Sequence, residues 1–357
     1  MRRWLALAAL MSIPATALAG YKVYEKDDQS LEVGMKVQAR MEYSRIPAVG
    51  GGTEWLRDYM IRRARLKLNG KMQGVTYCMQ WKIDNTDQVG VTSTAAVEDA
   101  YLQYPLKANL SARLGLYDAP FSRDLLTSDG KQLAVDRGVV SAVPSALGLV
   151  DNVVGFDLRG SMKEGHAQYV VGAYDNRIIA GRRQDIPMII GRVDLNFAST
   201  KDVYQDAHFG SDKWYCIGLN GNFQSSIDGA VAQDSTTTEA AGADGMIDIP
   251  FGRGRLMLRG EVNAIRQVVI GPATDKNGTV MMLGGGYLIM HERLQPFVRW
   301  DRIQGDTPIG GTPRDLTYAG ANFYQRGHSL KFQGDLQFAS GTGQSVDGGR
   351  LQAQIDF

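Results

Sequence analysis

The sequence has 357 residues, 44% of them hydrophobic, and its 39 Lys and Arg against 38 Asp and Glu give a formal net charge of +1. This balance excludes the strongly basic surface typical of nucleic-acid binding, and two cysteines are too few for a disulfide scaffold. A charged fraction of 22% with 9% aromatic residues excludes an intrinsically disordered chain, and the 42 glycines follow no Gly-X-Y period, which excludes collagen.

The first residues are typical of an export signal. Arg2 and Arg3 precede an apolar stretch, and an Ala-Leu-Ala sequence that ends at Ala19 provides the small residues of a cleavage site. We expect residues 1–19 to be a signal peptide and residues 20–357 to form the mature domain. The alternative is an N-terminal helix of a soluble core. The remainder of the chain has no apolar run of about 18 residues, so no membrane-spanning helix is expected.

Apolar and polar residues alternate along the mature chain, which places them on opposite faces of β-strands. The alternation is unbroken from Leu31 to Tyr43, and in the segment 328–338 it puts His328 on the apolar face. Each predicted strand has about the length that a tilted strand needs to cross a bilayer. The predicted strands are 31–43, 59–69, 75–84, 97–104, 109–117, 153–160, 166–174, 188–197, 214–223, 239–249, 255–264, 280–289, 294–301, 316–324, 328–338 and 350–357.

The predicted connections alternate between short and long. Short links occur at 70–74 and 105–108, and long ones at 44–58 and 118–152, but 198–213 is long where a short link is expected. Outer-membrane barrels join their strands by short periplasmic turns and longer outer loops. We therefore predict an all-β fold, a transmembrane antiparallel β-barrel of about 16 strands with apolar residues toward lipid and polar residues toward the lumen. The alternative is a soluble, exported β-sandwich or β-helix, which also alternates.

Several segments, in this order along residues 31–357, carry a family pattern: Arg62 to Leu66, Val97 to Tyr104, Arg113 to Tyr117 with the following Pro120 to Ser122, Asp136-Arg137, Phe297 to Asp301 and the terminal Phe357. Together they resemble the phosphate-selective porin O and P family. The resemblance implies a homotrimeric outer-membrane channel of sixteen strands, with an arginine ladder that guides anions and a third outer loop that folds inward. By the same resemblance, 118–152 is this constriction loop, and Arg63 and Arg65 are wall positions.

The predicted inward faces supply the candidate site residues. The first three strands form a basic wall, which we expect to line the pore with Lys36, Arg40, Arg63, Arg65, Lys67 and Lys82. The constriction loop adds Arg123, Asp124, Lys131, Asp136 and Arg137, and the other lumen positions are Arg113, Arg159, Arg192, Arg299 and Asp301. The whole loop 118–152 contains five Asp against three Lys and Arg, a net charge of −2. If this acidic loop faces the basic wall across water, the two create a transverse field that selects ions. The alternative is that these charges only solvate a wide lumen.

The predicted function is that of a porin in the outer membrane of a Gram-negative bacterium. It would let ions and small hydrophilic solutes diffuse passively, with anions such as phosphate among them. The expected partners are outer-membrane lipid, small ions or anionic solutes and further copies in a homotrimer, with no nucleic acid. The alternative is a structural sheath barrel that holds a partner protein, for example an electron-carrier conduit. The long 118–152 loop favours the narrowed channel.

Motifs of enzymes and of metal or cofactor sites are not found in the sequence. It has four histidines and no HExxH, CxxC or CxxCH, so we expect no catalytic residues, no metal and no cofactor. Cys78 and Cys216 lie on predicted strands that are far apart around the wall. Because a disulfide requires Cα atoms within about 7 Å, we expect two free thiols.

Overall fold

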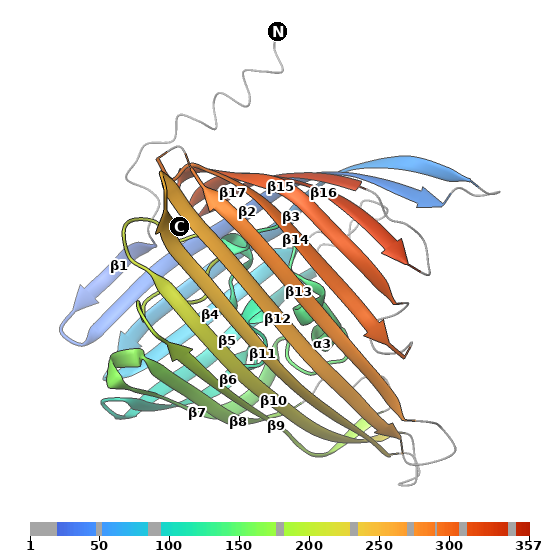
Figure 1. Cartoon of the computed structure of the whole chain (residues 1–357). Coiled ribbons are helices and arrows are strands. Elements are labelled where there is room, and N and C mark those ends of the chain that lie inside the picture. Colours follow the sequence, from blue (N-terminus) through green and yellow to red (C-terminus); the bar gives the residue numbers. More distant parts are fainter. Residues whose placement is uncertain are drawn as a thin grey trace.

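The computed structural model of the protein describes residues 20–47, 52–84, 94–175, 182–228, 235–269, 275–289, 291–306, 313–341 and 348–357. The predicted signal peptide lies outside these residues. The predicted closed barrel is confirmed, because each of sixteen strands pairs antiparallel with the next and the last pairs with the first (Figure 1). Within the described part of the chain, no helix is long and apolar enough to cross a membrane.

The barrel strands all correspond to predicted ones. Several are longer than predicted at the end of the barrel that carries the long connections, so that most of the predicted 44–58 loop is a strand hairpin. The barrel consists of β2 (Gln29–Pro47), β3 (Thr53–Met72), β4 (Val75–Asp84), β5 (Thr94–Lys107), β6 (Leu110–Tyr117), β7 (Val153–Met162), β8 (Ala167–Asp175), β9 (Arg182–Asn196), β10 (Trp214–Asp228), β11 (Ser235–Phe251), β12 (Gly254–Val269), β13 (Lys276–Leu288), β14 (Leu294–Gly305), β15 (Arg314–Arg326), β16 (Leu330–Gly341) and β17 (Gly348–Asp356).

One further strand, β1 (Tyr21–Lys26), was not predicted and lies outside the ring. It forms a hairpin with the beginning of β2, and all six of its residues are exposed. The seam between β17 and β2 ends where the backbone of Phe357 exchanges hydrogen bonds of 2.6 and 2.9 Å with Met35. The first residues of β2 therefore have no neighbour from β17, and β1 pairs with this open edge instead.

The two faces of the wall follow the alternation. On β17, Leu351 points outward and is 56% exposed, whereas Arg350 and Gln352 point inward and are buried. His328 corrects the prediction: it lies in the turn before β16, and its Nε2 donates a hydrogen bond of 2.8 Å to the carbonyl oxygen of Ala207. It contacts an inward-folded segment of the chain and not lipid, because β16 begins only at Leu330.

The long connection after β6 folds into the barrel, where Figure 1 shows its helices within the ring of strands. It contains α2 (Arg123–Leu126), η1 (Asp129–Lys131) and α3 (Val139–Ala146), and the remaining short helix η2 (Lys163–Gly165) lies in the turn between β7 and β8. The apolar side of the loop packs against inward residues of β9 to β15, such that Val140, Val150, Met188, Ile190 and Val280 are fully buried. This side of the lumen is therefore a closed hydrophobic core.

The connection 198–213, between β9 and β10, also folds inward. It is irregular in backbone, and Val203, Asp206, Ala207 and His208 are all buried. Its exceptional length, noted in the sequence, corresponds to a second inward segment at the end of the barrel that otherwise has short turns. The lumen thus holds two segments, one from each end.

Candidate functional site: a charged cavity between the basic wall and the constriction loop

Two β-bulges shape the charged side of the lumen. In the β2–β3 pair, Gln38 lies opposite Arg63 and the next residue, Ala39, lies opposite Ile61. Arg62 is therefore an extra residue on β3. In the β4–β5 pair, Gln80 lies opposite Asp99 and Trp81 lies opposite Val97, so Glu98 is an extra residue on β5. A bulge re-aims a side chain without breaking the sheet. Strict alternation therefore missed Arg62 and Glu98, whose side chains contact charged groups of the lumen.

Asp129, at the tip of the constriction loop, lies directly on the basic wall. Its carboxylate is 3.0 Å from Nε of Arg63, 2.7 Å from Nη1 of Arg65 and 3.2 Å from Nε of Arg137. Burial alone would raise the pKa of this carboxyl, but the three guanidinium groups outweigh it and hold the pKa well below its ordinary value. The aspartate is therefore ionised and neutralises part of the wall.

Asp136 docks a second part of the loop. It lies 2.7 Å from Nη2 of Arg40 on β2 and 2.7 Å from Nη1 of Arg350 on β17, with Nε of Arg62 at 4.0 Å. Burial alone would raise its pKa, but Arg40 and Arg350 hold it well below its ordinary value. The loop and the wall thus touch through ion pairs, where the sequence predicted opposite charges that face each other across water.

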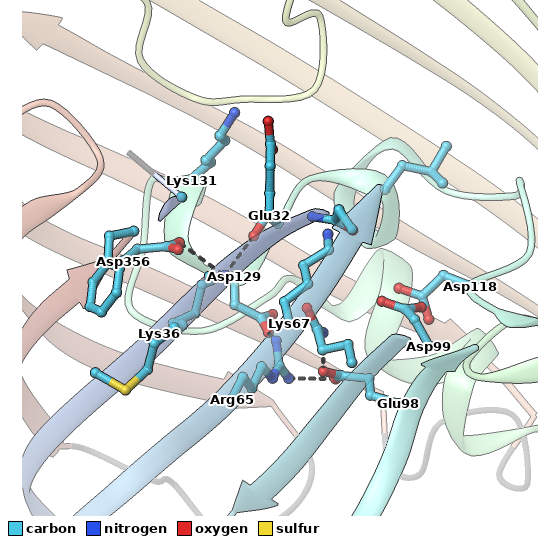
Figure 2. A pocket seen from close by; sticks show the side chains of 18 of the residues that line it. Glu32, Lys36, Arg65, Lys67, Glu98, Asp99, Asp118, Asp129, Lys131 and Asp356 are labelled. Carbon is cyan, nitrogen blue, oxygen red and sulfur yellow. Dashed lines mark hydrogen bonds and ion pairs between the residues drawn. The ribbon is translucent and has the colours of Figure 1, made fainter. Parts of the chain in front are cut away.

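A cavity of about 500 Å³ remains between β2 to β5 and the loop, and Figure 2 shows the charged side chains that line it. Lys36 pairs with Asp356 at 3.2 Å, and Arg65 pairs with Glu98 at 2.6 Å. Lys67 lies half-buried on the cavity wall, and among the described residues no carboxylate lies within ion-pair distance of it. The cavity therefore combines neutralised pairs with an ammonium group that is available to a solute.

Five predicted site residues lie on the sealed side of the lumen. Arg123 is 2.6 Å from Asp244, Arg192 is 2.8 Å from the same carboxylate, and Arg299 is 3.1 Å from Asp301. Asp124 pairs with Arg259 and accepts a hydrogen bond of 2.6 Å from Ser141. The predicted residues Arg123, Asp124, Arg192, Arg299 and Asp301 are at most 2% exposed. Arg192, Arg299 and Asp301 face the interior under the loop, and Arg123 and Asp124 belong to the loop itself. These residues therefore hold the loop in place and do not line a water-filled passage.

The remaining predicted residues lie nearer to the open side. Lys82 is 3.9 Å from Glu98, and Arg159 is 2.6 Å from Asp157. Arg113 stacks over the ring of Tyr101 at 4.2 Å and donates to Gln103 at 2.7 Å. Lys131 and Arg137 line the cavity from the loop. The structure therefore brings Lys36, Arg65, Lys67, Lys131 and Arg137 together around one cavity.

Neither cysteine forms a disulfide. Cys78 on β4 and Cys216 on β10 are both free and buried, as predicted. In the described part of the chain, no group of three or more His, Cys, Asp or Glu side chains is arranged to hold a metal ion.

Comparisons with known proteins agree with this architecture. Residues 33–185 match the family model described as phosphate-selective porin O and P. Among curated protein sequences, none matches this chain.

Solved structures share the fold over nearly the whole length. The outer membrane channel DcaP of Acinetobacter baumannii has a TM-score of 0.65 at 13% identity, with 95% of this chain and 100% of that chain covered. The anion-selective porin from Comamonas acidovorans has a TM-score of 0.62 at 14% identity, with coverages of 92% and 100%. The trimer form of OmpT of Vibrio cholerae has a TM-score of 0.61 at 8% identity, with coverages of 93% and 100%. The predicted family resemblance is confirmed over residues 33–185, and the chain shares the barrel fold of solved outer-membrane porins.

Proposed function

We propose that the protein is a narrow diffusion channel for ions and small hydrophilic solutes, with only a modest preference for anions. The observation that carries this proposal is the cavity of about 500 Å³ between the basic wall and the loop. Its lining runs from Phe357, at the end of the barrel with short turns, to Asp118, directly after β6. Charged and amide groups around such a passage replace the water that a polar solute loses.

The modest anion preference follows from the ion pairs of the wall. Arg63 and Arg65 are the family's wall positions by resemblance, but here both are engaged by Asp129. A guanidinium that already has a carboxylate partner attracts a second anion weakly, because the pair has little net charge. Lys67 is then the wall residue that contacts a passing anion, and we expect phosphate to pass without strong binding.

A planar-bilayer recording tests the function. We expect discrete conductance steps and a reversal potential slightly on the anion side in a potassium chloride gradient. Phosphate added to the bath should reduce chloride current only in proportion to its concentration. Purified protein that is folded by circular dichroism but produces no steps would contradict the proposal.

The same proposal covers location and assembly. Location in the outer membrane of a Gram-negative bacterium and assembly into a homotrimer are supported by the family match and by the fold shared with the trimer form of OmpT. Removal of residues 1–19 on export is proposed from the sequence alone. The sheath alternative requires an open bore. Because the constriction loop and the segment 198–213 both occupy the lumen, a channel for small solutes is favoured.

A further inference from the structure

We propose that the segment 198–213 is a positioning element for the constriction loop, and that Asp206 is the residue that fixes the tip of this loop. The proposal rests on the function as a diffusion channel and assigns a role to a connection that enters the lumen from the short-turn end. It explains why this one connection is long where a short turn would join β9 to β10.

Asp206 contacts both the loop and the wall. Its backbone N–H donates 3.0 Å to the carbonyl oxygen of Lys131, and its Oδ2 accepts 2.7 Å from the backbone N–H of Leu133. The same carboxylate lies 2.5 Å from Nη1 of Arg259 on β12, and the Asp206 carbonyl accepts 3.1 Å from Nε2 of Gln295 on β14. Asp206 is only 2% exposed, and it connects the segment 198–213 to the constriction loop and to the barrel wall.

The segment is itself anchored to the wall. The backbone N–H of His208 donates a hydrogen bond to the carboxylate of Asp248, and the Nδ1 atom of its ring lies 2.8 Å from the same carboxylate. The ring stacks on that of Trp214, with the ring centroids 3.7 Å apart. Arg255 donates 2.5 Å to the carbonyl oxygen of Gly210. These contacts hold the segment rigidly against β10 to β12, so Asp206 presents a fixed surface to the loop.

The tip of the loop is consequently held from two sides. On one side Asp129 lies on Arg63 and Arg65, and on the other side Lys131 and Leu133 bond to Asp206. Lys131 also lines the charged cavity, so the position of this tip sets one dimension of the passage. The tip also accepts hydrogen bonds from Lys331 at the carbonyl oxygen of Gln132 and from Asn322 at that of Leu133. If the contact with Asp206 is lost, these bonds remain, but Lys131 and Leu133 lose their bonds to the segment 198–213 and the tip moves more freely at the opening.

The ends of the segment make it removable. The N–H of Phe197 donates 2.8 Å to the carbonyl oxygen of Tyr215, and the N–H of Ser199 donates 2.9 Å to that of Lys213. The strand ends therefore already pair as a ladder, and deletion of 200–212 with an Asn-Gly linker joins β9 to β10 by a two-residue turn. In the deletion variant Arg259 loses Asp206 but keeps its ion pair with Asp124.

Three variants of the full chain test the proposal: the deletion of 200–212, Asp206→Asn, and the control Asp212→Asn, whose side chain is exposed at the end of the segment. We expect larger and noisier single-channel conductance in the first two and wild-type conductance in the third. Amide exchange at Leu133 should become faster by roughly 10- to 100-fold in the first two, the factor for a lost hydrogen bond to a charged group. Heat-modifiable migration confirms that each variant is folded.

The outcomes separate the two proposals. Wild-type conductance and unchanged exchange in the folded deletion variant would overturn the role of the segment, even if Asp206→Asn does not fold. A wild-type protein that does not conduct would overturn the proposed function, and the exchange rate at Leu133 would then decide the positioning role alone.

Discussion

Removal of the Lys67 charge is the sharpest test of the charged cavity. Lys67 lines this cavity, and because no carboxylate lies within ion-pair distance of it in the described residues, Lys67→Gln removes one positive charge without breaking an ion pair. Arg63→Gln would instead remove one of the three guanidinium partners of the buried Asp129 and disturb the loop. Lys67→Gln should therefore fold normally and change the electric field that a passing ion meets.

The size of the effect follows from Coulomb's law. One unit charge at about 7 Å in water corresponds to about 0.6 kcal/mol, and a Debye length of about 10 Å at 0.1 M salt reduces this to about 0.3 kcal/mol. Each ion is then enriched or depleted about 1.6-fold, so the anion-to-cation permeability ratio should fall about threefold in Lys67→Gln. At about 1 M salt the Debye length is about 3 Å, and the ratio should change by only about 1.2-fold.

The assay is the reversal potential in a potassium chloride gradient, measured in dilute and in concentrated salt. Lys71→Gln is the matched control, because Lys71 follows on the same strand, is exposed and does not line the cavity. An equal shift in both variants, or none in Lys67→Gln at low salt, would show that the cavity beside Lys67 is not the conducting path.

Three other results are expected. Burial raises the pKa of Asp118, in the loop, from its ordinary 3.8 to about 8, so the folded state loses stability as pH rises from about 4 to about 8. The preference for cations should increase as pH passes about 8, and Asp118→Asn should show no such step. Deletion of Phe357 should impair membrane insertion, since it removes the two backbone bonds to Met35 that end the seam; normal insertion would contradict this. Chemical cross-linking in intact membranes should yield a homotrimer, and exclusively monomeric protein would refute that assembly.

The sequence predicted the barrel strands because, in every strand, residues that face lipid are apolar and the alternate residues that face the lumen can be polar. It missed β1, which is short and lies outside the ring of the barrel. Alternation also fails at a bulge, which is why Arg62 and Glu98 are absent from the predicted lumen residues. Both features depend on pairing, which periodicity does not report.

The sealed side of the lumen corresponds to a weak alternation in the sequence. In the predicted strand 280–289 the alternation is weak, because Val280 and Met282 are apolar although they point inward. They pack against the loop and are part of the hydrophobic core. A strand that is apolar on both faces is typical of burial on both sides, so this segment already indicated that something covers the inner wall.

The ion pairs of Asp136 have a consequence for biogenesis. Arg40 belongs to the first barrel strand and Arg350 to the last, so a single carboxylate from the middle of the chain bridges the two strands whose pairing completes the ring. The side chain of Gln354, also on β17, donates 3.1 Å to the carbonyl oxygen of Gly130. The loop thus contacts both strands of the closing seam, and we expect Asp136→Asn to slow the acquisition of heat-modifiable migration more than it alters the finished barrel.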